Sequence, residues 1–172
     1  EGATLSREEE RAIWRSCVES VGARVPIVAA IASAGTREAV ELAREAERSG
    51  CRGLMVLPPY VYQGAWREIK AHFAAIFRAT HLSCMLYNNP IAYGTDTTPE
   101  QIAELASEHA NLHALKESSA DVRRITAIRS LLRDRLALFV GVDDLIVEGI
   151  AAGATGWIAG LVNAFPRESV AL

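Results

Sequence analysis

The sequence predicts an α/β fold of the (β/α)8 TIM-barrel class, and three observations support that prediction. Apolar runs rich in β-branched residues alternate along the chain with amphipathic segments that carry Glu and Arg. No Ser-, Gly- or Pro-rich linker interrupts the alternation, so we expect residues 1–172 to form a single domain. Tyr87 and Lys116 stand at the carboxyl ends of successive apolar runs, where barrels present polar side chains. A doubly wound sheet, which chain length alone slightly favours, has little use for both.

Each apolar run is interpreted as a parallel strand, because strands buried on both faces read as continuous apolar sequence. The amphipathic segments between them are interpreted as the covering helices. In chain order we expect a helix at 6–21, a strand at 25–33, a helix at 36–49, a strand at 53–59, a helix at 64–79, a strand at 82–88, a helix at 98–109, a strand at 112–118, a helix at 120–134, a strand at 136–142, a helix at 144–152 and a strand at 155–162.

Start and stop signals agree with these elements. Ser6 has Glu9 three residues later, which is the pattern of a capping box, and Thr98 is followed by Pro99 at the first helical position. Thr36 precedes an Arg-Glu pair and is expected to cap its helix in the same way. Two glycines, Gly50 and Gly153, are each expected to end a helix just before the next strand.

Composition excludes several classes of protein. The chain is 50% hydrophobic with a net charge of -3, and its longest basic block is the Arg123-Arg124 pair, so we expect no nucleic-acid partner. The apolar run at 27–32 is far shorter than the about 20 residues that span a bilayer, so we expect no membrane segment. The sequence has no secretory leader pattern and begins without Met, which suggests a cytoplasmic protein and a fragment of a longer one.

Metal and cofactor sites are not expected. The cysteines have no CxxC spacing and are interpreted as reduced thiols; they are Cys17, Cys51 and Cys84. The histidines have no ligand spacing; they are His72, His81, His109 and His113. The pair Asp143-Asp144 lacks further carboxylates and is expected to cap a helix. The glycine-punctuated segments 141–144 and 153–160 match no phosphate-binding motif and are expected to be tight turns.

Lys116 is the most informative residue in the chain. By strand alternation it shares a face with Leu112 and Ala114, which predicts an inward-facing lysine. Burial favours the neutral amine, which is the form that attacks a ketone carbonyl to give an imine. The alternative is an ordinary strand-end lysine that pairs with Glu117 or Asp143 in solvent.

Tyr87 ends the preceding strand, and its phenol is suited to passing a proton to and from a carbinolamine and a leaving group. The alternative is a tyrosine that caps a buried strand with its hydroxyl in water. A hydrolase triad has little support, because Ser33 and the Ser118-Ser119 pair lack a GxSxG elbow.

The motif Tyr87-Asn88-Asn89-Pro90, followed by Gly94 and then by Lys116-Glu117, resembles the dihydrodipicolinate synthase and N-acetylneuraminate lyase family. These barrel enzymes bind 2-oxo acids as Schiff bases. Further matches follow in the same order along the chain: Glu1 resembles the end of the family's GTTGE turn, and 3–10, Pro58-Pro59-Tyr60, 141–144 and 153–160 resemble later segments.

The resemblance implies roles for individual residues. Lys116 would form the imine, Tyr87 would relay protons, Ile158 would line the bound 2-oxo acid, and Pro59 and Tyr60 would shape the mouth of the pocket. The hydroxyls that hold the substrate carboxylate in the family precede Glu1. The sequence also lacks the family's first two strands and C-terminal helices, so we expect the middle of a longer, tetrameric enzyme that is unstable or inactive as this piece alone.

Two departures bear on the substrate. The synthase carries an arginine two residues after the proline of its motif, whereas this chain has Ile91-Ala92-Tyr93. Val61 stands where the synthase's partner subunit offers a second relay tyrosine, although Tyr62 is adjacent.

The sequence from Tyr87 to Gly94, together with 116–121, most resembles that of the 1-pyrroline-4-hydroxy-2-carboxylate deaminases of hydroxyproline breakdown. The substrate of those enzymes is a cyclic imine. The alternative within the same chemistry is a synthase or aldolase that uses pyruvate. From another class, the alternative is a non-catalytic, small-molecule-binding or regulatory descendant of a barrel; such a protein would be expected to have lost the lysine, and Lys116 is present. A flavodoxin-like binding module is the third alternative; it predicts a phosphate-binding loop after the first strand, which the turn at 33–36 supplies only weakly.

Overall fold

The computed structural model describes residues 4–172, and its centre is a six-stranded parallel sheet in which strand order follows chain order. The strands are β1 (Val28–Ile31), β2 (Gly53–Val56), β3 (Ser83–Asn88), β4 (Leu112–Glu117), β5 (Ala137–Val140) and β6 (Gly156–Trp157). The helices are α1 (Arg7–Val21), α2 (Thr36–Arg48), α3 (Trp66–Arg78), α4 (Pro90–Tyr93), α5 (Pro99–Glu108), α6 (Arg123–Leu132), α7 (Ile146–Ala151) and α8 (Pro166–Ala171), with short 3-10 turns at η2 (Asp143–Leu145) and η3 (Leu161–Asn163).

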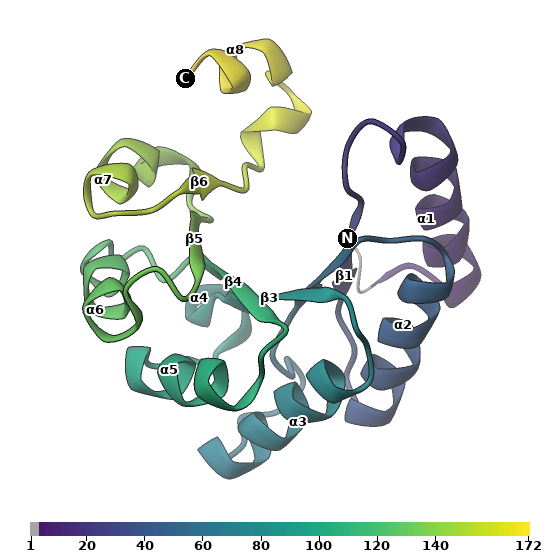
Figure 1. Ribbon diagram of the computed structural model, residues 1–172, viewed down its shortest axis with the longest axis horizontal. Helices are drawn as coiled ribbons and strands as arrows, with labels where there is room; N and C mark the ends of the chain where they lie inside the picture. The colour runs from purple at the N-terminus through teal and green to yellow at the C-terminus, as the bar shows by residue number, and fades with distance from the viewer. Residues whose placement is uncertain (1–3) are drawn as a thin grey trace.

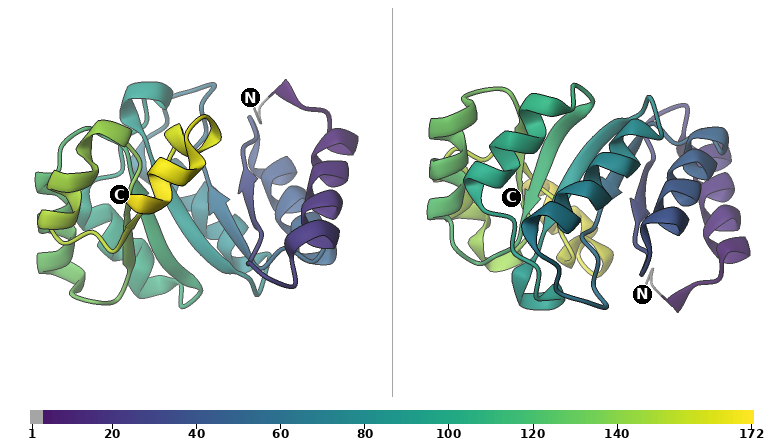
Figure 2. Two further views of the ribbon diagram at one scale, coloured as in Figure 1. Left: turned by 90° about the horizontal axis from the view of Figure 1, so that it is seen from above. Right: turned by 90° about the horizontal axis from the view of Figure 1, so that it is seen from below.

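The elements form an arc with the strands on its inner side and the helices on its outer side, and α1 and α8 lie at the two ends (Figure 1). The view from below in Figure 2 shows α3 and α5 covering the outer face of the sheet. Every strand pairs in parallel with its neighbour in sequence. A doubly wound sheet reverses its strand order at a switch point, so this order confirms the barrel class and excludes the flavodoxin-type arrangement. The predicted match of Glu1 and Ala3 to the family's turn lies outside the described residues.

The main core lies between the sheet and the helices. It is built from alternate strand residues, including Ile31, Leu54, Val56, Leu86, Leu115 and Val140, and from helix residues that include Leu42, Phe73, Phe77, Ile102, Leu105 and Ile128. The opposite, inward side chains, such as Met55, Met85 and Phe139, are only half-buried. One face of each strand therefore packs against the helices, and the side chains of the other face are available to form a site.

Most helix caps agree with the sequence. Ser6 and Glu9 form a capping box, and Thr98 caps α5 with Pro99 at its first position. The two helix-ending glycines, Gly50 and Gly153, have φ values of 88° and 106°, which a residue with a side chain rarely adopts.

The prediction that Thr36 caps a helix is wrong. Gly35 is the cap residue of α2, and the Thr36 hydroxyl lies 2.9 Å from Nδ1 of the buried His72. A tertiary contact has taken the hydroxyl that the local pattern assigned to the helix end.

Several predicted boundaries are too generous. The strand expected at 25–33 is reduced to β1, and the helices expected at 64–79 and 120–134 are reduced to α3 and α6. The strand expected at 155–162 is wrong beyond Trp157: the Asp143 carboxylate accepts hydrogen bonds from the backbone N–H groups of Gly160 and Leu161 at 3.0 and 2.9 Å, and the chain turns into η3. The sequence pattern did not predict α4 or α8.

No helix within residues 4–172 is long and apolar enough to cross a membrane. The same residues contain no group of three or more His, Cys, Asp or Glu side chains that could hold a metal ion. All three cysteines are free, and burial raises the pKa of the Cys84 thiol to about 12. Cys84 is therefore an inert packing residue.

Candidate active site

Lys116 and Tyr87 are brought together by the pairing of β3 with β4. The register shifts by one residue between Cys84 and Met85, so that Tyr87 lies directly opposite Lys116. The Lys116 ammonium nitrogen lies 4.2 Å from the centroid of the Tyr87 ring. This irregularity corrects one detail of the sequence analysis, because Leu112 now pairs with Cys84 in the core and only Ala114 shares the face of Lys116.

Space for the Lys116 side chain depends on Gly141, which follows β5. A Cβ atom on Gly141 would overlap Oγ of Ser118 and would lie 2.8 Å from Cε and 3.1 Å from Cγ of Lys116. Ser118 is 2% exposed, and its Oγ has no hydrogen-bond partner among the described residues. Gly141, Ser118 and the stem of Lys116 therefore form one tightly fitted group at the carboxyl edge of the sheet.

Lys116 forms no ion pair within residues 4–172, so the alternative of a lysine paired with Glu117 or Asp143 is not what the structure contains. Glu117 follows Lys116 on the same strand and points to the opposite face, as alternation requires. The Asp143 carboxylate is occupied by Gly160, Leu161 and the Trp157 indole, whose Nε1 donates over 3.1 Å. Asp143 thus closes the turn after β6, and the predicted capping role for the acidic pair is wrong because Val142 is the cap residue of η2.

Three tyrosines line the same edge in contact with one another. The Tyr87 and Tyr93 rings meet edge to face with centroids 5.8 Å apart, and the Tyr93 and Tyr60 centroids are 6.4 Å apart. Burial, with smaller contributions from the neighbouring Tyr87 and Tyr60 hydroxyls, raises the pKa of Tyr93. The side-chain amide of Asn89 donates a hydrogen bond of 3.0 Å to the Tyr87 hydroxyl oxygen. The tyrosines therefore form a continuous aromatic wall beside Lys116.

The remaining predicted site residues lie at the same edge of the sheet. Pro59 is buried, and its carbonyl accepts a hydrogen bond of 3.3 Å from the Thr95 hydroxyl. Ile158 follows β6, and its N–H donates to the Val140 carbonyl over 2.9 Å. Ile158 is two residues beyond Gly156, which pairs with Phe139, so alternation places it on the face that carries Lys116.

The outer side of β3 and β4 carries a separate polar network. Glu117 is 5% exposed and accepts hydrogen bonds from the Asn88 amide at 3.1 Å and from the Ser119 N–H at 2.7 Å. The Arg124 guanidinium lies 3.5 Å from Glu117 and 2.9 Å from Asp96. This network joins the strand ends to α6 and holds the Glu117 carboxylate on the helix side of the sheet.

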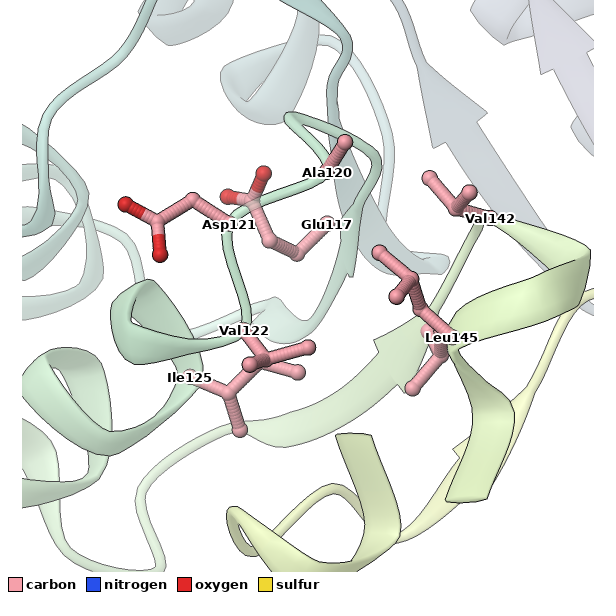
Figure 3. Close-up of a pocket in the computed structure, with 8 residues that line it drawn as sticks. Glu117, Ala120, Asp121, Val122, Ile125, Val142 and Leu145 are labelled. Atoms are coloured by element: carbon pink, nitrogen blue, oxygen red, sulfur yellow. The ribbon is translucent and has the colours of Figure 1, made fainter. Parts of the chain in front are cut away.

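A small cavity adjoins this network between the sheet and the outer helices (Figure 3). Its volume of about 10 Å³ has room for about one water molecule. Side chains of Val122, Ile125, Val142 and Leu145 surround it. A cavity of this size cannot hold a substrate. The candidate site is the edge that carries Lys116 because Tyr87 lies directly against that lysine there.

Sequence reasoning missed four residues of this edge: Asn89, Tyr93, Ser118 and Gly141. The motif around Tyr87 already contained Asn89 and Tyr93, and strand alternation places Ser118 on the face of Lys116. Gly141 stands in the glycine-punctuated segment 141–144, but its local sequence did not show that a side chain is excluded there, because the atoms that exclude it belong to Lys116 and Ser118.

The fold and this edge together define a class: a barrel-type α/β protein with a lysine and a tyrosine side by side at the carboxyl edge of neighbouring parallel strands. The model of the dihydrodipicolinate synthetase family matches residues 1–172, and the chain belongs to that family.

Individual relatives agree with this assignment. The chain is 34% identical over 169 residues to a 4-hydroxy-tetrahydrodipicolinate synthase of Clostridium perfringens, a match that covers 98% of this chain and 58% of the relative. The crystal structure of a chloride-inhibited dihydrodipicolinate synthase from Acinetobacter baumannii complexed with pyruvate has a TM-score of 0.93 and 30% identity, over 98% of this chain and 58% of that one. A prophage protein of the same family from E. coli K12, also in complex with pyruvate, gives a TM-score of 0.92 at 27% identity, over 97% and 57% of the two chains. The chain thus spans somewhat more than half the length of the relatives that it matches.

Proposed function

We propose that the protein uses Lys116 to form a Schiff base with pyruvate and carries out a lyase or synthase reaction on the resulting adduct. The observation that carries this proposal is the placement of the Lys116 ammonium nitrogen 4.2 Å from the Tyr87 ring centroid, with no carboxylate paired to it among the described residues. Two relatives of known structure are described as pyruvate complexes, which supports pyruvate as the carbonyl compound.

The chemistry follows from the two side chains. The neutral amine of Lys116 attacks the C2 carbonyl of pyruvate, and the carbinolamine loses water to give an imine. Tyr87 supplies a proton to the departing hydroxyl and recovers one from the C3 methyl group, which leaves an enamine. The enamine carbon then attacks a second carbonyl compound, or the reverse sequence releases one. No external oxidant, reductant or metal is required.

The names of the relatives support this pyruvate chemistry better than the hydroxyproline-derived deaminase suggested by the motif wording. The second substrate is proposed to differ from that of the synthase, because α4 offers Ile91 and Ala92 where the synthase has an arginine for the substrate carboxylate. Both residues are exposed, and neither carries a charge. An aldehyde without a carboxylate at this end fits that surface.

The assembly is proposed to be a homotetramer by resemblance to the family. Val61 and Tyr62 lie in the loop after Tyr60, and both are exposed, at 61% and 44%. A tetramer contact through this loop would cover both side chains and bring Tyr62 of one subunit toward the edge of another.

The test is the intact mass of the full-length gene product after incubation with pyruvate and borohydride. One reduced pyruvate adduct is expected in the wild type and none in Lys116→Ala. Folded wild-type protein that forms no adduct would contradict the proposal. Release of ammonia from 1-pyrroline-4-hydroxy-2-carboxylate, with no consumption of pyruvate and aldehyde, would instead restore the deaminase.

A further inference from the structure

The side chain of Asn89 performs two tasks at once. It is the cap residue of α4, and its Oδ1 accepts a hydrogen bond of 3.0 Å from the Ala92 N–H. Because the oxygen of the amide is fixed by that donor, the nitrogen must point the other way. It lies 3.0 Å from the Tyr87 hydroxyl oxygen, to which it donates.

This hydrogen bond determines what Tyr87 can do with its own hydrogen. The phenol oxygen already accepts from Asn89, so its O–H must donate in another direction. The Tyr93 ring packs edge to face against Tyr87, and Lys116 lies against the Tyr87 ring. These two contacts hold the Tyr87 ring in place. The Tyr87 O–H can then donate toward the side of the ring on which an adduct on Lys116 would lie.

We infer that Asn89 is a positioning residue that acts through Tyr87, by aiming the phenol hydrogen at the Lys116 adduct and by stabilising the phenolate once that hydrogen has been donated. The inference deepens the proposed Schiff-base function and rests on it. An amide N–H bonds more strongly to a phenolate than to a phenol. The contribution therefore grows as the proton moves from the Tyr87 oxygen to the departing hydroxyl, and it lowers the barrier without tightening pyruvate binding.

Two substitutions separate this role from simple helix capping. Ser and Asp both cap helices well, so Asn89→Ser and Asn89→Asp should keep α4 in place. Ser is too short to reach Tyr87, whereas Asp has the length of Asn but offers only acceptors. A carboxylate at this position would draw the phenol hydrogen toward itself and would oppose the phenolate. We expect Asp to be the more damaging of the two, although it matches Asn in shape.

The experiment measures exchange of the pyruvate methyl hydrogens in D2O by proton NMR, which needs no second substrate. Exchange reports imine formation followed by proton transfer at C3. Asn89→Ser should slow exchange at saturating pyruvate by about 10- to 100-fold, with KM for pyruvate little changed. Asn89→Asp should slow it further, and circular dichroism should show both variants folded.

Tyr87→Phe provides the matched background. If Asn89 acts through the phenol, Asn89→Ser should change exchange by less than about twofold when Tyr87 is already Phe. An equal loss in both backgrounds, or exchange at the wild-type rate in Asn89→Asp, would overturn the inference. Borohydride trapping distinguishes the two levels: a wild type that traps no pyruvate refutes the proposed function, whereas normal trapping with unaltered exchange in the Asn89 variants refutes only the role of Asn89.

Discussion

Replacing Gly141 with alanine tests the site most directly, because one added carbon meets the stem of the proposed nucleophile. The Cβ would lie 2.8 Å from Cε of Lys116, against about 3.5–4.0 Å for a comfortable carbon contact. Cε must therefore move by about 0.7 Å or more, and Nζ moves with it. A displacement of about 1 Å in a reacting group can cost about 100-fold in rate. We expect pyruvate trapping by Gly141→Ala to slow by about that factor.

Stability should fall as well. Replacing glycine with alanine normally stabilises a protein by about 0.4–1 kcal/mol because it restricts the unfolded chain. Overpacking costs about 1–3 kcal/mol, and the overlap with Ser118 Oγ makes this second effect dominate. The double variant Gly141→Ala with Ser118→Ala removes that overlap and leaves the Lys116 contact. It should regain stability in urea denaturation while trapping remains slow.

Gly35→Ala is the matched control, because a Cβ there meets no heavy atom within 4 Å. Its trapping rate should equal that of the wild type. If Gly141→Ala traps pyruvate at the wild-type rate with undiminished stability, the fitted group around Lys116 does not exist as described, and the steric reasoning fails.

Three further predictions concern stability. Ala120 is exposed and has a φ of 63°, a conformation that costs about 1–2 kcal/mol for a residue with a side chain. Ala120→Gly should therefore raise the free energy of unfolding, measured by urea denaturation, by about 0.5–1 kcal/mol. A decrease would refute the strain at this position. Arg124→Ala leaves the buried Glu117 carboxylate without its cation and should cost about 3 kcal/mol, part of which Glu117→Gln should restore in calorimetry. Burial lowers the pKa of His72, so the unfolded chain takes up a proton before the folded chain does as pH falls below about 6.5. The free energy of unfolding should therefore be highest above pH about 7 and should fall toward pH about 5. The fall should be smaller in His72→Gln.

The sequence predicted that Lys116 and Tyr87 stand at the carboxyl ends of successive strands, because strand alternation and strand ends are local properties. It did not predict the register that joins them. Uninterrupted pairing from Cys84 and Leu112 would set Tyr87 opposite Leu115, and the shift between Cys84 and Met85 moves it to Lys116. A one-residue irregularity is decided by how two strands pack against the rest of the fold, which a single strand does not encode.

Other failures have the same origin. The strand expected at 155–162 is cut short by the Asp143 carboxylate, and the Thr36 hydroxyl is taken from its helix by His72. In both cases a side chain distant in sequence competes with a local preference and prevails. Local patterns located the six strands and the helices between them, although they missed α4 and α8, and contacts between elements determined where the elements ended.

The alternation of β4 explains how adjacent residues of opposite charge serve different purposes. Lys116 and Glu117 would form an obvious ion pair in an extended peptide, yet they point to opposite faces of the sheet. Glu117 is satisfied on the helix side by Asn88, Ser119 and Arg124. A carboxylate beside a lysine favours the ammonium form, which cannot attack a carbonyl. By holding Glu117 on the outer face, the buried network keeps this adjacent carboxylate away from Lys116, where it would oppose the proposed Schiff-base formation.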